Sequence, residues 1–184
     1  MTLFEKHKPL IDQAIHAIHA RNFWAAYPEH PKAYGEDTMG NGQRNYNEML
    51  GKKFEALNQS DTALWDGEEV SPYTLEKLNI SYPLFTSSQL IERAMNAQQI
   101  WKNISVDERA GLLVECLEVI KGKFFEIAFA TMHTTGQSFM MSFQASGPHS
   151  NDRALEPIAL GYEELTRFPS SVLWEKPMGK FSIK

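Results

Sequence analysis

The segment between residues 86 and 136 constrains the fold most, because it carries consecutive helix start and stop signals. Thr86 or Ser87 can cap a helix that runs to about Asn103. Ser105 and Glu108 then form a capping box, in which the serine hydroxyl and the glutamate satisfy free amides at a new helix start. We therefore predict a mainly α-helical protein.

Apolar residues recur at helical spacing in both of these helices. The stripe of the first comprises Leu90, Ile91, Ala94, Ala97 or Gln98, and Trp101. That of the second comprises Leu112, Leu113, Cys116, Leu117 and Ile120. Gly122 predicts a break, after which a helix from Phe124 to Thr134 ends at Gly136. We expect each stripe to be buried.

Further helices are predicted outside this segment. An amphipathic helix from Phe4 to Asn22 carries Leu10, Ile11, Ala14, Ile15 and Ile18 on one face. Others are expected over Tyr46–Leu57, over Pro72–Leu78 and over Asp152–Arg167, where Pro157 lies in the first turn or bends the helix.

Two segments are predicted to be non-helical. Residues 22–51 interleave aromatic side chains with Pro and Gly, which is typical of an irregular arm that wraps over an apolar surface. Val172–Lys176 and Lys180–Lys184 flank Pro177 and Gly179, a pattern that predicts a β-hairpin or two successive strands.

Composition limits the class of partner. The net charge of −5 and the pI near 5.7 argue against nucleic acid or an anionic membrane surface. No apolar run approaches the roughly 20 residues that span a bilayer. The single cysteine excludes an intramolecular disulfide, and with charges in place of a signal peptide's apolar core it favours the cytoplasm.

Cys116 is the only thiol and the first candidate nucleophile. A reactive cysteine needs an accessible, electropositive site. Because Cys116 lies within an apolar stripe, we expect a buried packing residue instead.

The candidate metal ligands are Asp12, His16 and His19, which share one helix face. No fourth ligand accompanies them, so we expect a solvated face and no metal. We expect His133 to interact with a helix C-terminus and His149 to lie in a loop.

Other polar residues also suggest structural roles. The glycines between Gly35 and Gly42 lack the Lys-Ser or Lys-Thr pair of a phosphate loop. Glu115, Glu118 and Glu126 are expected to form solvated ion pairs. Arg109 is disfavoured in the first turn of a helix, so we expect it to have a partner: a structural salt bridge or carbonyl, rather than a substrate.

The chain resembles the start of aldehyde dehydrogenases. The pattern comprises Ala94, Ala97, Trp101, Ser105, Arg109, Leu112-Leu113 and Thr135-Gly136, although Gln137 stands where the family commonly has lysine. Residues 23–36, 65–69 and 138–169 look like one branch of the family, the phenylacetic acid degradation (PaaN) branch.

This resemblance implies a division of the chain. Residues 1–85 would be an N-terminal helix plus arm, residues 86–169 the helices that lie near a cofactor domain, and residues 170–184 the start of oligomerisation strands. It also implies that the whole enzyme oxidises an aldehyde with NAD or NADP, through a cysteine nucleophile and a glutamate that activates water.

The chain ends before any residue that matches those groups, and Cys116 does not match the family's nucleophile motif. We therefore predict no catalytic, cofactor-binding or metal-binding residue here and no bound cofactor. The prediction is an N-terminal portion that is inactive alone and forms homo-oligomers through its C-terminal strand and apolar helix faces. The alternative is a stand-alone helical assembly module without enzymatic activity.

Overall fold

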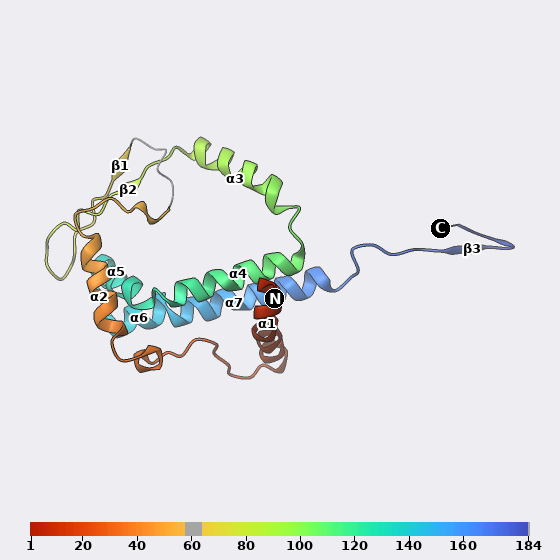
Figure 1. Ribbon diagram of the computed structural model, residues 1–184, viewed down its shortest axis with the longest axis horizontal. Coiled ribbons are helices and arrows are strands. Elements are labelled where there is room, and N and C mark those ends of the chain that lie inside the picture. The colour runs from red at the N-terminus through yellow and green to blue at the C-terminus, as the bar shows by residue number, and fades with distance from the viewer. Residues whose placement is uncertain (58–63, 184) are drawn as a thin grey trace.

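The computed structural model describes residues 1–57 and 64–183, and most of them form helices (Figure 1). Helix α4 (Val106–Lys121) lies along α7 (Pro148–Thr166), and α1 (Leu3–Ala20) packs against both. At the other end of this pair, α5 (Phe124–Thr135) packs against α2 (Thr38–Met49) and α6 (Phe139–Ser146). The predicted mainly α-helical class is confirmed.

Helix ends follow the local signals. The capping box of Ser105 and Glu108 starts α4, and Gly136, with φ of 77°, ends α5. Thr2 and Glu5 form a further box at the start of α1. Helix α7 begins four residues earlier than expected because Pro148 occupies its first turn. Pro157 therefore lies inside the helix rather than at its start.

Tyr27 and Tyr34 of the arm pack on the bundle, as predicted, but Phe23 is exposed, and Thr38–Met49 of the segment predicted to be irregular forms helix α2. Tyr27 is buried, and the ring centroid of Tyr34, from the short 3-10 helix η1 (Pro31–Tyr34), lies 5.5 Å from that of Phe124. Phe124 and Phe125 themselves are buried under the arm and α6. The core is therefore complete around α5.

Of the predicted apolar stripe of α4 only Leu117 is buried. Its buried residues are Ala110, Gly111, Val114 and Leu117, whereas Leu112, Leu113, Cys116 and Ile120 are exposed. Small residues form the buried side because α1 approaches closely: a Cβ on Gly111 would lie 2.5 Å from the backbone nitrogen of Phe4. The prediction of a buried Cys116 therefore fails.

Helix α3 (Ser87–Trp101) is detached from the bundle (Figure 1). It starts at Thr86 with a capping box, as predicted, but it has no buried residue. The expected buried stripe, including Leu90, Ile91 and Trp101, is exposed. The prediction that this stripe is buried is therefore wrong for the described residues.

Two predicted helices between residues 46 and 78 are replaced by other structure. Helix α2 spans Thr38–Met49, with Gly40 and Gly42 inside it, and a 3-10 turn, η2 (Glu55–Leu57), follows later. Gly42 is required because a Cβ there would lie 2.3 Å from Cβ of Phe125. Residues 72–74 form a turn and Lys77 forms an isolated bridge with Val70, because Leu75 adopts a φ of 61° that a right-handed helix does not permit.

The strands are short and antiparallel. β1 (Trp65–Asp66) pairs with β2 (Tyr82–Pro83), a pair the sequence did not suggest. β3 (Lys176–Met178) pairs with β4 (Phe181–Ile183) in a C-terminal hairpin, as predicted. β3 shares only Lys176 with the predicted first strand and includes Pro177, which was expected between the strands. Lys184, the expected end of the second strand, lies outside the described residues. Across those residues, no helix combines the length and apolar character needed to cross a membrane.

Candidate functional site

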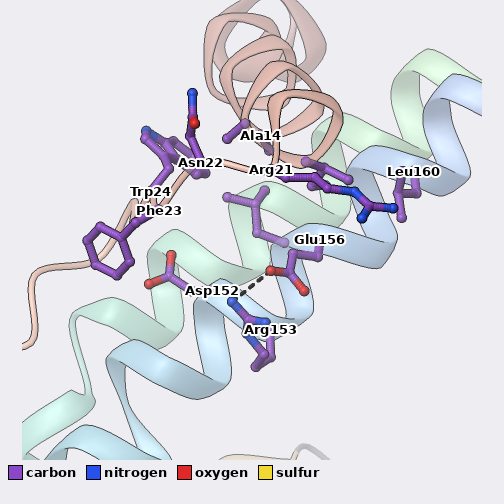
Figure 2. A pocket seen from close by; sticks show the side chains of 12 residues that line it. Ala14, Arg21, Asn22, Phe23, Trp24, Asp152, Arg153, Glu156 and Leu160 are labelled. Atoms are coloured by element: carbon purple, nitrogen blue, oxygen red, sulfur yellow. Dashed lines mark ion pairs between the residues drawn. The ribbon is translucent and has the colours of Figure 1, made fainter.

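A cavity of about 390 Å³ lies where the start of the arm crosses α1 and α7 (Figure 2). Apolar side chains from the two helices, including Ala14, Ile18 and Leu155, line it together with Trp24 and charged residues. Figure 2 shows Arg21 and Trp24 on the arm side and Asp152, Arg153 and Glu156 on α7.

Arg21 enters the cavity from a left-handed turn. Its φ of 53° ends α1, and its amide donates to the carbonyls of Ala17 and Ile18. Left-handed backbone costs a non-glycine residue roughly 1 kcal/mol. Within the described part of the chain the guanidinium has no hydrogen bond or ion pair, so it is available to an anion.

Asp152 uses its carboxylate to hold the arm. Its Oδ1 accepts a hydrogen bond from the amide of Ala26 at 2.9 Å. Burial raises the pKa of Asp152, opposed by backbone hydrogen bonds from the arm. Three residues away, His149 forms an ion pair with Glu29 at 3.0 Å, although a loop position was predicted for it. Both contacts fix the arm to α7.

These residues suit binding or anchoring rather than catalysis. Arg153 is neutralised by Glu156 at 2.7 Å (Figure 2), and Asp152 is engaged by the arm. No cysteine, serine or histidine lines the cavity, so it has no nucleophile that a base could activate. The sequence alone does not predict this site, because the segments that line it lie about 130 residues apart in the chain.

The predicted metal trio does not come together. Asp12 pairs with Lys8, and His19 pairs with Glu163 of α7. Searched over the described residues, the chain holds no group of three metal-ligating side chains. Asp12 therefore forms an ion pair within α1, and His19 forms one between α1 and α7.

His133 has a structural role that differs from the predicted helix cap. The Ser71 hydroxyl lies 2.8 Å from its Nδ1 and accepts from the amides of Tyr73 and Thr74. The ring stacks on Tyr46, and burial lowers the pKa of His133. Because Ser71 is fully buried, this pair anchors the turn at residues 71–74 and cannot act on a substrate.

The expected ion pairs of the glutamates are present. Glu118 pairs with Lys121 and Glu126 with Lys123, each within one turn. Glu115 instead joins two helices: it accepts from Lys6 at 2.6 Å and lies 2.5 Å from Nε2 of His7. The expected salt bridge of Arg109 is absent among the described residues.

A nicotinamide cofactor does not fit the residues present. A dinucleotide needs a glycine-rich turn between a strand and a helix. The glycines from Gly35 to Gly42 instead follow a 3-10 turn and enter α2, where Gly42 is buried against Phe125. No step through a cofactor can therefore be assigned to these residues.

Comparison with solved structures identifies a relative of this fold. An NAD-dependent aldehyde dehydrogenase from Burkholderia multivorans matches 98% of the chain with 42% identity and a TM-score of 0.92. The chain has the fold of part of an aldehyde dehydrogenase. The similarity supports the aldehyde dehydrogenase superfamily, to which the sequence pattern from Ala94 to Gly136 also points.

The aldehyde dehydrogenase-like chain corresponds to a minor part of that relative. It covers 33% of the Burkholderia protein's length. A scan against models of protein families finds no match, and a search of curated proteins finds none either.

Proposed function

We propose that this chain is the N-terminal scaffold portion of a PaaN-like aldehyde dehydrogenase and is not catalytic by itself. The whole enzyme would oxidise an aldehyde with NAD or NADP during aerobic phenylacetate degradation in the cytoplasm. The observation that carries the proposal is the 42% identity over 98% of the chain with an NAD-dependent aldehyde dehydrogenase.

The geometry of the described residues supports a scaffold role. The thiol of Cys116 lies on an exposed apolar face of α4, and the Ser71 hydroxyl beside His133 is fully buried. The cavity beside Arg21 contains no nucleophile. The chemistry of the family would thus come from parts of a longer polypeptide.

A chimeric enzyme tests the scaffold role. The matched third of the Burkholderia enzyme is replaced by this chain, and aldehyde-dependent NAD reduction is measured beside the parent enzyme. We expect kcat/KM within about tenfold of the parent, because the scaffold keeps the fold while the catalytic groups are unchanged. A folded chimera without activity would contradict the proposal.

The isolated chain provides the matched control. We expect no aldehyde oxidation with NAD or NADP, and no effect of Cys116→Ser on the chimera's kcat. Turnover by the chain alone that disappears in the Cys116→Ser variant would show that the nucleophile lies here. Deleting the gene should slow aerobic growth on phenylacetate but not on acetate, which tests the PaaN branch.

A second candidate function is an assembly module, and the exposed apolar faces favour it. Helix α3 has no buried residue, and Val172, Leu173 and Trp174 of the tail are exposed. Exposed apolar surface of this extent commonly marks a protein interface. Sedimentation of the isolated chain over a hundredfold range of concentration tests it: a monomer throughout would remove this candidate.

A further inference from the structure

The cavity beside Arg21 is built like a small-molecule site. Its volume of about 390 Å³ and its mainly apolar lining are those of pockets that hold small ligands, which commonly measure roughly 300–1,000 Å³. Leu155 of α7 belongs to the buried core and Trp24 of the arm packs against that core, while Ile18 lines the cavity from α1. Because these walls come from packed elements, the cavity is formed before a ligand binds.

Three of the four charged side chains that line the cavity already have partners. Asp152 accepts a hydrogen bond from the amide of Ala26, and Arg153 and Glu156 form an ion pair at 2.7 Å. The side chain of Arg21 makes no hydrogen bond or ion pair to any residue that the structure describes. The guanidinium of Arg21 is therefore the group of this cavity that is left for a ligand.

The arrangement of the charges leaves room for an anion at one end of the cavity. Figure 2 shows the side chain of Arg21 extending away from Asp152, so that the guanidinium and the Asp152 carboxylate lie in different parts of the cavity. An anion that pairs with Arg21 therefore avoids the like charge of Asp152. The apolar body of the same ligand can contact Ile18 and Leu160, which line the cavity from α1 and α7.

The position of Arg21 in the backbone favours glycine, and a helix end alone does not require arginine. Arg21 ends α1 with a φ of 53°, a conformation that glycine adopts without strain. A cation at the C-terminal end of α1 is favoured by the helix dipole, but lysine supplies that charge equally well. The planar guanidinium differs from lysine because it can donate two parallel hydrogen bonds to one carboxylate.

We propose that this cavity binds a small organic carboxylate, whose carboxylate group pairs with the guanidinium of Arg21 and whose apolar body lies against Ile18, Leu155 and Leu160. The ligand is held unchanged, because no cysteine, serine or histidine lines the cavity. This site goes beyond the scaffold role proposed above and does not rest on it, since every group that forms it belongs to this chain.

The test titrates the chain with 2-naphthoate and with its uncharged analogue 2-naphthamide, and follows labelled isoleucine and leucine methyl groups by NMR. We expect 2-naphthoate to bind with a dissociation constant on the order of 1 mM, as an aromatic acid of this size does in an open site. The amide should bind about five- to tenfold more weakly, because it lacks the charge that pairs with arginine. The methyl signals of Ile18, Leu155 and Leu160 should shift, whereas those of Ile91 and Leu173, which are exposed elsewhere, should not.

Variants of Arg21 separate ligand binding from folding. Arg21→Gly should bind 2-naphthoate about five- to tenfold more weakly and unfold at the same temperature or higher, because glycine relieves the left-handed backbone. Arg21→Lys should have an intermediate affinity, because lysine keeps the charge but not the paired donors. Arg167→Gly is the matched control: Arg167 also ends a helix, but it pairs with Glu164 and does not line the cavity. It should leave the affinity unchanged.

Three results would overturn this site. If the amide binds as tightly as the acid, or if Arg21→Gly keeps the native affinity, the cavity does not recognise a carboxylate through Arg21. Shifts at Ile91 and Leu173 as large as those at Ile18 would show that the probe adheres to any exposed apolar surface. No binding at about 10 mM of the acid would leave the cavity without this ligand class. Each of these results leaves the scaffold role untouched, because that role is tested by the activity of the chimera.

Discussion

At the residue scale, Gly111 determines how closely α1 approaches α4. A Cβ added there would lie 2.5 Å from the nitrogen of Phe4 and 2.8 Å from its Cα, and backbone cannot move aside as a side chain can. We expect Gly111→Ala to destabilise the chain by about 1–3 kcal/mol through overpacking. Urea unfolding followed by circular dichroism measures the change.

Gly161 of α7 is the matched control, because a Cβ there meets no atom within 4 Å. Gly161→Ala should stabilise the chain by about 0.5–1 kcal/mol, since alanine loses less backbone entropy in a helix. Equal effects of the two substitutions would contradict the close approach of α1.

At the same contact between α1 and α4, the carboxylate of Glu115 makes the stability of the fold depend on pH. The hydrogen bond from Lys6, then that from His7, holds its pKa below the ordinary 4.5. A lowered carboxyl pKa stabilises the folded state fully above the unfolded value, and the contribution is lost as pH falls through the folded value. The advantage of the native chain over Glu115→Gln should therefore be full at pH 7, begin to fall near pH 4.5 and vanish as the pH falls through the lower pKa of the folded state.

Unfolding free energies of both proteins between pH 3 and pH 7 give this difference directly. Glu164→Gln, which removes an exposed pair with Arg167 inside α7, controls for the loss of one charge. A difference between native and Glu115→Gln protein that grows toward acid would have the opposite sign and would exclude the pairing.

At the element scale, the sequence predicted helix ends better than helix faces. The boxes at Thr86 and Ser105 are local, so three or four residues suffice to identify them. Which face of a helix is buried depends on the elements from distant parts of the chain that pack against it. Leu112 was assigned to the core although small residues such as Gly111 form the packed side, because apolar periodicity does not reveal that α1 needs close approach.

The two capped helices should respond differently to loss of their caps. Ser105→Ala should lower global stability by about 1 kcal/mol, because α4 is integral to the bundle. Thr86→Ala should leave the global midpoint unchanged and speed amide exchange within α3, since a helix without tertiary packing unfolds independently. Hydrogen exchange by mass spectrometry separates these effects, and a global loss from Thr86→Ala would place α3 in the cooperative core.

At the scale of the whole molecule, the candidate cavity depends on contacts that no local pattern encodes. The carboxylate of Asp152 accepts a hydrogen bond from the amide of Ala26. Arg21 adopts a left-handed backbone conformation, which is usually recognised in a sequence by a glycine. The mainly α-helical class could be predicted because helix start signals such as those at Thr86 and Ser105 are local in the sequence. Individual side-chain partners had to come from the structure, which has no salt bridge for Arg109 among the described residues although one was expected.

The C-terminal hairpin should be separable from the bundle. β3 pairs with β4, and Figure 1 shows the tail extending away from α7. Removing residues 170–184 should leave the thermal midpoint unchanged, because the segment adds no residue to the core. It should reduce concentration-dependent association, because the exposed Leu173 and Trp174 and an open strand edge are lost. Calorimetry and sedimentation of both lengths measure the two effects.

A lower midpoint in the shorter chain would show that the tail stabilises the bundle. Unchanged association would show that the chains associate through the exposed faces of α3 and α4 rather than through the tail.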